Sequence, residues 1–160
     1  MIEVDRWLKE NAAQLGINPD NVNPHSVDIC LGGHIIVFDQ WGQKVEELQL
    51  EDGAAFTFRP GHFYLCHTAE TVHVPETHTA QLWLKSSTAR KGLNHLLAGY
   101  CDSGFTGSLT LEFVAYMPAT FTIGQRIAQL QYGRLTSTPE RPYSVTGRYQ
   151  GSVGAVESKG

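Results

Sequence analysis

Short apolar runs separated by turn residues dominate the chain from Val27 onward. The predicted strands are Val27–Leu31, His34–Phe38, Ala55–Arg59, Phe63–Cys66, Gln81–Leu84, Ser108–Phe113, Thr120–Ile123 and Ala128–Tyr132. Between them lie Gly and Pro pairs that form tight turns, such as Gly32-Gly33, Asp52-Gly53 and Pro60-Gly61. Many short strands at this spacing predict an all-β barrel or jelly roll.

Helical periodicity occurs at two places. Residues 2–15 carry a loose apolar face made of Ile2, Trp7, Leu8, Ala12 and Leu15. Segment Ser87–Leu97 predicts one internal helix, because its apolar residues also share a face. From Pro139 the chain is rich in Ser, Thr, Gly, Arg and Tyr, which predicts a flexible arm. We therefore expect one domain with an N-terminal helix and turn (1–22), a barrel (23–138) and a C-terminal lid (139–160).

Composition narrows the class of protein. With 160 residues, 41% hydrophobic and 18% charged, the chain is long and apolar enough for one globular core. The net charge of −4 argues against an extended basic surface for nucleic acid, but it does not exclude a local cationic pocket. We expect no membrane span and no secretory signal. Three widely spaced cysteines, Cys30, Cys66 and Cys101, predict buried free thiols and a cytoplasmic protein.

The segment Lys85–Phe113 concentrates the candidate chemistry. It begins with Lys85, Ser86, Ser87 and Arg90, and this mixture of cations and hydroxyls suits a phosphorylated ligand at the start of a helix. A plainer interpretation stays open, in which a serine only caps the helix and Arg90 is solvated.

Two carboxylates follow in the same segment. Side chains alternate between the two faces of a strand, so Glu112 lies on the face away from Leu111 and Phe113. It therefore either faces solvent or serves a functional site. Asp102 lies in a turn before Gly104, where an Asp is often only a turn residue and otherwise a ligand contact.

Several motifs resemble one known superfamily. The motifs are NPHSVDICLG, SSTARKGL, AGYCDSGFTGSLTLEF, IGQRIAQLQYGRL and ERPYSVTGRYQGSVGA, which together extend from about Asn23 to Ala155. In this order they resemble the dCTP deaminase and dUTPase superfamily, and the C-terminal motif is similar to the deaminase branch. The resemblance implies a distorted jelly-roll barrel, a C-terminal arm that folds over the active site, and a homotrimer with shared sites.

The resemblance also implies residue roles around the base and sugar. Glu112 would be the catalytic carboxylate, and Ser86 and Arg90 would place it and the attacking water. Around the nucleoside, the backbone carbonyl of Ala98 would lie near the base and Phe105 under the sugar. Asp102 would meet the deoxyribose 3′-OH, and in the diphosphatase branch it would also activate the water that attacks the α-phosphate. His95 lies close in sequence to these candidate residues and could touch the base.

Further roles concern the triphosphate. The resemblance implies that Lys85, Ser87 and Gln129 contact the phosphates, and that Tyr143 and Arg148 close over them from the arm. Ser152 occupies a position where the deaminase branch often has Gln. Arg126 is expected to be structural. Mg²⁺ is expected as the companion of the triphosphate, with no zinc.

Four kinds of function remain in competition, and the second of them has two forms. The leading one is deamination of dCTP to dUTP and ammonia. Its rivals in the superfamily are dUTP diphosphatase and a bifunctional enzyme, because the turn Gly99–Ser103 resembles the diphosphatase pattern more closely. A non-catalytic nucleotide-binding regulator is a third option. A cupin-like metal module is the fourth, but His62, His67, His73 and His78 lack a known zinc-site spacing.

Overall fold

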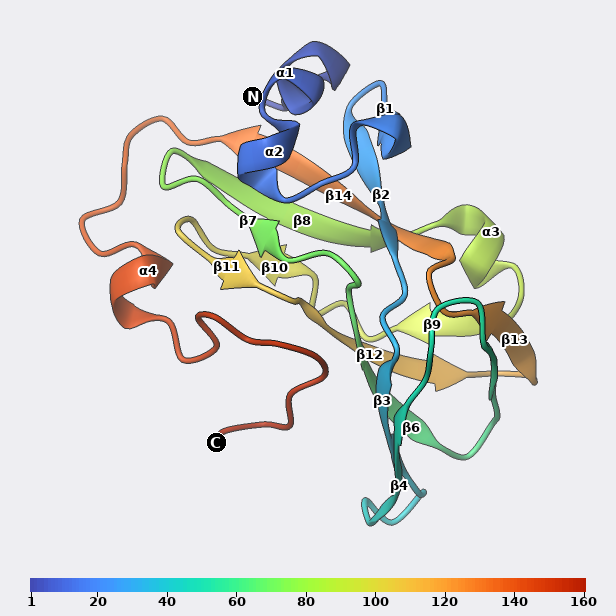
Figure 1. Cartoon of the computed structure of the whole chain (residues 1–160). Coiled ribbons are helices and arrows are strands. Elements are labelled where there is room, and N and C mark those ends of the chain that lie inside the picture. Colours follow the sequence, from blue (N-terminus) through green and yellow to red (C-terminus); the bar gives the residue numbers. More distant parts are fainter.

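The computed structural model describes residues 1–160 and consists mainly of antiparallel strands in two five-stranded sheets (Figure 1). The first sheet has the order β1 (Val22–Asn23), β2 (Ser26–Cys30), β14 (Arg126–Arg134), β8 (His78–Leu84) and β10 (Tyr100–Cys101). The second has the order β4 (Lys44–Gln49), β3 (His34–Phe38), β6 (Phe63–His67), β12 (Thr110–Ala115) and β9 (Leu93–His95). Two small pairs complete the fold, β7 (Val72–His73) with β11 (Thr106–Gly107) and β5 (Ala55–Phe58) with β13 (Ala119–Thr122). The all-β, jelly-roll-like prediction is confirmed, although the hydrogen-bonded sheets do not close into one continuous barrel.

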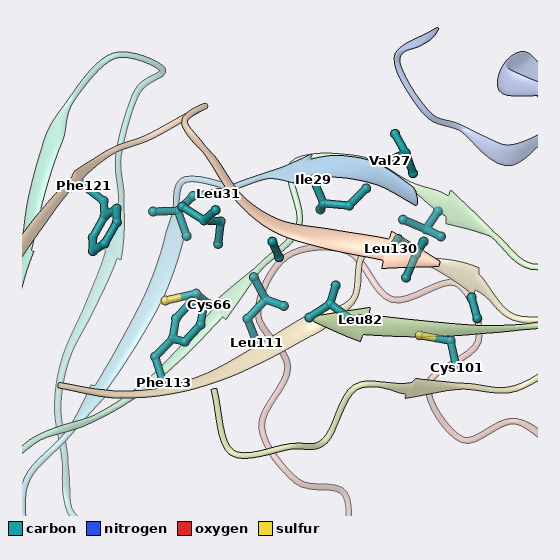
Figure 2. Packing of buried hydrophobic residues seen from close by; sticks show 14 of the residues in the cluster. Val27, Ile29, Leu31, Cys66, Leu82, Cys101, Leu111, Phe113, Phe121 and Leu130 are labelled. Carbon is teal, nitrogen blue, oxygen red and sulfur yellow. The ribbon is translucent and has the colours of Figure 1, made fainter. Parts of the chain in front are cut away.

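The hydrophobic core lies between the two sheets. Alternate residues point inward, so that Leu111 and Phe113 of β12 are buried while Glu112 between them is not. Figure 2 shows Leu111 beside Leu82 of β8, and Phe113 beside Cys66 of β6. All three cysteines are free, and Cys66 and Cys101 are buried in this core.

The N-terminal helix is broken into two short pieces, α1 (Asp5–Glu10) and α2 (Ala12–Leu15). Leu8 and Leu15 are buried, as the apolar face predicted. The inclusion of Ile2 was wrong, because Ile2 precedes the helix and bridges to Gly133 in strand β14. A 3-10 turn, Pro19–Asn21, then leads into β1. No helix is both long and apolar enough to cross a membrane.

The predicted helix over Ser87–Leu97 is wrong for most of its length. The helix is a single turn, α3 (Ser86–Ala89), and the chain then forms strand β9. Gly92 adopts a left-handed backbone with φ +84°, which ends the helix. The following residues pair with β12, and this burial of Leu93 and His95 outweighs the helical periodicity.

Strand β4 is absent from the sequence-based prediction. Its sequence, KVEELQ, has no apolar face, and all its residues except Leu48 are exposed. Backbone hydrogen bonds to β3 hold it as the edge of a hairpin. Hydrophobic patterning cannot find such a strand, because the pattern reports burial and not backbone pairing.

The C-terminal arm, residues 139–160, passes alongside the two sheets and contains the short helix α4 (Tyr143–Thr146) (Figure 1). It buries more than its composition suggested. Ala155 is buried in a small cluster with Ile36 of β3 and Leu65 of β6. Tyr143 packs against the main core.

Candidate active site

A cavity of about 640 Å³ lies between the second sheet, the turn after β10 and the C-terminal arm. Five of the candidate site residues named from the sequence line it: Asp102, Phe105, Glu112, Tyr143 and Ser152. Further lining comes from exposed or half-buried aromatic side chains, which are Phe38, Phe63, Tyr100 and Tyr149. This size and this mixture of apolar walls with a few polar groups are typical of a small-molecule site.

Glu112 stands on the wall of this cavity with one side-chain partner. Its Oε2 is 3.1 Å from Nε2 of His95, whose side chain is only 5% exposed, whereas that of Glu112 is 26% exposed. An ionised carboxylate only accepts hydrogen bonds, so Nε2–H of His95 donates to it. The pair arises because β9 and β12 are neighbours and Phe113 is the register partner of His95. Glu112 is therefore a fixed, partly desolvated carboxylate at the edge of the cavity.

The second carboxylate of the cavity comes from a tight turn. The N–H of Phe105 donates to the carbonyl of Asp102 at 3.2 Å, and Gly104 between them has φ +85°. Asp102 is exposed toward the cavity, whereas Phe105 is buried with its ring edge-on to Tyr143 at 5.8 Å. The turn thus presents a carboxylate acceptor beside the buried ring of Phe105.

The arm completes the cavity from the other side. The hydroxyl of Tyr143 accepts the N–H of Tyr149 at 3.1 Å. Gln150 bridges the turn, since its amide accepts from the N–H of Thr106 and donates to the carbonyl of Gly104, both at 3.0 Å. Ser152 lines the cavity as well. Arg148 does not, because its side chain lies in the exposed part of the arm.

The charges of the cavity are all acidic. Asp102, Glu112 and Glu157 are among the lining residues, and no Lys, Arg or His is. A triphosphate needs cations or many N–H donors, so within one chain this cavity offers acid–base groups without phosphate-binding charge.

The predicted phosphate ligands gather elsewhere. We call Lys85, Ser86, Ser87, Arg90 and Gln129 the α3 group, since four of them lie in or beside helix α3 and Gln129 lies on the adjacent strand β14. Ser86, Ser87 and Arg90 are exposed, and none of the five lines the cavity. The interpretation of a serine as helix cap fails, because the N-cap residue is Lys85 and it makes no side-chain cap.

A buried carboxylate organises the α3 group. Asp28 of β2 is 4% exposed at its side chain and is ion-paired to Lys85. It also accepts from Asn23 at 2.9 Å and Gln129 at 3.3 Å. Burial alone would raise the pKa of Asp28, but the bonds from Lys85 and Asn23 outweigh it and hold the pKa below its ordinary value. Arg126 lies 3.7 Å from the same carboxylate, which agrees with a structural part for it.

The four histidines considered for a metal make separate contacts. His67 bonds to Thr68, His73 to Thr106, and His78 to Glu3 and Thr77, while His62 lies near the carbonyl of Pro60. No group of three or more His, Cys, Asp or Glu residues is arranged to hold a metal ion. Each of these four rings therefore has its own hydrogen-bond partner within the protein.

The structure adds residues that the sequence did not single out. His95 was considered only as a contact to the base, and its bond to Glu112 depends on a strand that was predicted as helix. Tyr100, 64% exposed, stands two residues before Asp102 on the cavity wall. Residues two apart in an extended segment share a face, so the position of Asp102 could have indicated Tyr100 from the sequence. Ala98 lies in the exposed loop between β9 and β10 and outside the cavity lining.

Comparison with known proteins assigns the family. A dCTP deaminase-like family model matches residues 3–135, and the chain therefore belongs to the dCTP deaminase-like family of enzymes. A protein of Mycolicibacterium paratuberculosis named "dCTP deaminase, dUMP-forming" is 36% identical over 99% of this chain and 95% of its own length. A protein of the same name from Rhodococcus jostii is 37% identical over 99% of this chain and 96% of its own length.

The same fold occurs in a solved structure. The crystal structure of 2′-deoxycytidine 5′-triphosphate deaminase from Agrobacterium tumefaciens superposes with a TM-score of 0.68 and 21% identity. The match covers 82% of this chain and 48% of that chain, so this protein spans about half the length of the Agrobacterium one. At this identity the likeness concerns the fold.

Proposed function

We propose that this protein hydrolyses dCTP to dUMP, ammonia and diphosphate. The observation that carries the proposal is Glu112, a partly buried carboxylate fixed by His95 on the wall of a nucleotide-sized cavity. Relatives that are aligned along nearly the whole chain bear the name of this reaction. Their name moves the expected product from dUTP, which the sequence favoured, to dUMP, the product of the bifunctional alternative.

The deamination step follows from the position of Glu112. The carboxylate takes a proton from a water molecule, and the hydroxide attacks C4 of the cytosine ring. Glu112 delivers this proton to N3, then takes the proton of the new C4 hydroxyl and passes it to the amino group. The C4–N bond breaks, ammonia leaves and C4 becomes a carbonyl. His95 holds the carboxylate through Nε2–H and so keeps the proton-accepting oxygen aimed at the cavity.

The second step releases diphosphate. A water molecule attacks the α-phosphate, and the bond between the α-phosphorus and the bridging oxygen breaks. The resemblance assigns activation of this water to Asp102 in the diphosphatase branch, and in this chain Asp102 lines the same cavity as Glu112. One bound nucleotide could meet both carboxylates.

Phosphate binding needs charge that the cavity of one chain lacks. We propose that the α3 group of a neighbouring subunit supplies it, in the homotrimer that the resemblance implies. Arg148 of the arm would add a second cation when the arm closes. Mg²⁺ would arrive with the triphosphate, whose oxygens suit it, and no zinc is required. The three free cysteines suit a reducing cytoplasm.

The test is an assay of products. Purified protein is incubated with dCTP and Mg²⁺, and dUTP, dUMP, diphosphate and ammonia are separated over time. The proposal predicts that dUMP and ammonia appear in equal amounts and that a zinc-selective chelator leaves the rate unchanged. Accumulation of dUTP alone would restore the simple deaminase, and turnover of dUTP without ammonia from dCTP would indicate a diphosphatase. Binding without turnover of either would indicate a regulator.

A further inference from the structure

The last part of the arm lies directly against the barrel. We call residues 151–157 the strap. Hydrogen bonds of the strap backbone join it to the barrel: Ser108 N–H donates to the carbonyl of Ser152 at 2.8 Å, and Val156 N–H donates to Oγ1 of the Thr110 side chain at 3.1 Å. Ser152, Val156 and Glu157 of the strap line the cavity. The position of the strap therefore decides whether this side of the cavity is closed.

One further bond of the strap goes to a histidine ring. The N–H of Ala155 donates to Nδ1 of His34 at 3.1 Å, while Nε2 of the same ring is 2.9 Å from Oε1 of Glu47. Nδ1 can accept only if it carries no proton, so the ring is neutral with its proton on Nε2. A protonated ring would turn N–H toward N–H, and Ala155 would lose its acceptor.

The strap approaches this ring as closely as a backbone can. Gly154 has φ +74°, a conformation that favours glycine. A Cβ on Gly154 would lie 2.8 Å from Nδ1 of His34. The sequence Gly154-Ala155 is thus fitted to the histidine, which argues against a chance contact of a loose tail.

The surrounding charges come from three elements. On β4, Glu47 accepts from His34, and Lys44 bonds to Glu47 at 3.0 Å and to Glu157 of the strap at 2.7 Å. On β6, Nε2 of the neutral His67 accepts the N–H of His34 at 3.1 Å, and its Nδ1–H donates to the carbonyl of Thr68. Glu47 stabilises a positive charge on His34, and the exposed pair of Lys44 and Glu157 holds the strap only weakly.

We propose that His34 is a positioning residue that holds the strap against the cavity only while its ring is neutral, so that protonation of His34 opens the cavity. Histidine changes its charge between about pH 5 and pH 8. Closure of the strap is independent of the reaction. Its effect on turnover rests on the proposed function.

The wild-type protein gives the first test, by NMR of the His34 ring nitrogens and hydrogen exchange of the strap amides. Exchange rates are corrected with an unstructured peptide of residues 148–160. We expect the Nε2–H tautomer at about pH 8, and protonation on going to about pH 5.5. Protection of the Ala155 and Val156 amides should fall about five- to tenfold with the same midpoint, as expected for one lost hydrogen bond. The Nδ1–H tautomer, or protection independent of ring charge, would overturn the inference.

Variants separate His34 from other groups. His34→Asn offers an uncharged oxygen near the place of Nδ1, so the strap should stay protected at both pH values. His34→Gln reaches toward Glu47 without that acceptor, so protection should be lost at both. Gly154→Ala should also open the strap at both, while His25→Asn, at an exposed histidine, should behave as wild type. If His34→Asn still opens with acid, another group such as His67 controls the strap and the inference is wrong.

Activity then distinguishes the two proposals. If the strap opens with His34 charge and dCTP is not turned over at any pH, the proposed function fails and this inference stands. If dCTP is turned over but the strap stays closed at every pH, the reverse holds. If both are correct, acid should lower the turnover of wild type more than that of His34→Asn.

Discussion

The cavity beside Glu112 and the α3 group differ in charge and in shape. The cavity is concave and carries Asp102, Glu112 and Glu157 without a cation. The α3 group is a surface with two cations, the exposed Arg90 and the half-buried Lys85. In Figure 1 helix α3 lies at the right edge of the molecule and the arm at the left. A nucleoside triphosphate needs the features of both regions, an acid–base group at its base and cations at its phosphates.

The difference explains how the proposed triphosphate substrate, a polyanion, is compatible with a chain whose net charge is −4. Acidic groups beside the reacting base and cations on a separate surface need not neutralise each other within one subunit. In the homotrimer that we propose, the cations of one subunit face the cavity of the next.

The largest effect is expected for Glu112→Gln. The amide keeps the shape of the side chain but cannot take a proton from water, so ammonia release should fall about 10²–10⁴-fold. Nucleotide binding should change little, which a titration with dCTP checks. The matched control is Glu51→Gln at an exposed acid outside the cavity. Deamination by the Glu112 variant at the wild-type rate would make Glu112 a surface residue and remove the contrast between the two regions.

A smaller effect, on stability, is expected for Asp28→Asn. The change leaves Lys85 without its partner, and breaking such a pair should lower the free energy of unfolding by about 2–4 kcal/mol, since Lys85 is only partly buried. Denaturant unfolding measures the loss, with the exposed Asp20→Asn as control. An equal effect of both changes would mean that Asp28 does not organise the α3 group.

The pH dependence of the same pair has a definite sign. The pKa of Asp28 is held below its ordinary value, so its contribution to stability is complete above about pH 3.9 and is lost as the pH falls through the lower folded value. Asp28→Asn should remove this part of the acid destabilisation. The unfolding free energies of wild type and variant should therefore converge toward low pH.

The smallest effect is expected for His95→Phe. The ring keeps much of the packing against Phe113, but Glu112 loses its fixed donor, so kcat should fall about tenfold and KM should change little. His95→Gln, which can still offer an N–H, should recover most of the rate. The acid limb of the pH–rate profile should move in the Phe variant and not in the Gln variant. Equal rates in all three would reduce His95 to a core residue.

Much of the fold could be predicted because burial leaves a pattern. The strands with inward-facing side chains, such as His34–Phe38, appear in the sequence as apolar runs and appear in the structure at nearly the same residues. Strand β4 could not be found because its pairing uses backbone groups that every residue has. Strand β9 was predicted as helix, because a segment of three or four residues is too short to distinguish the apolar spacing of a helix from that of a strand.

The candidate site was harder to predict from the sequence than the fold. Its residues came from the resemblance, and the structure brings Glu112, Asp102, Phe105 and Tyr143 to one cavity. The bond between His95 and Glu112 joins residues 17 apart and depends on register, which no local pattern encodes. Nor does the sequence show that Lys85 is already paired to Asp28, because that contact spans 57 residues. This pairing leaves Arg90 as the more available cation for a phosphate.

Subunit complementation tests most directly whether one active site combines the cavity of one subunit with the α3 group of another. Glu112→Gln and Arg90→Ala are each expected to be inactive in ammonia release from dCTP. The two proteins are unfolded together, refolded as a mixture and compared with each protein refolded alone. If one site takes Glu112 from one subunit and Arg90 from another, about a quarter of the sites regain both residues and the mixture recovers about a quarter of the wild-type rate. A mixture as inactive as its components, despite mixed oligomers, would show that each site takes both residues from one chain and would contradict the account.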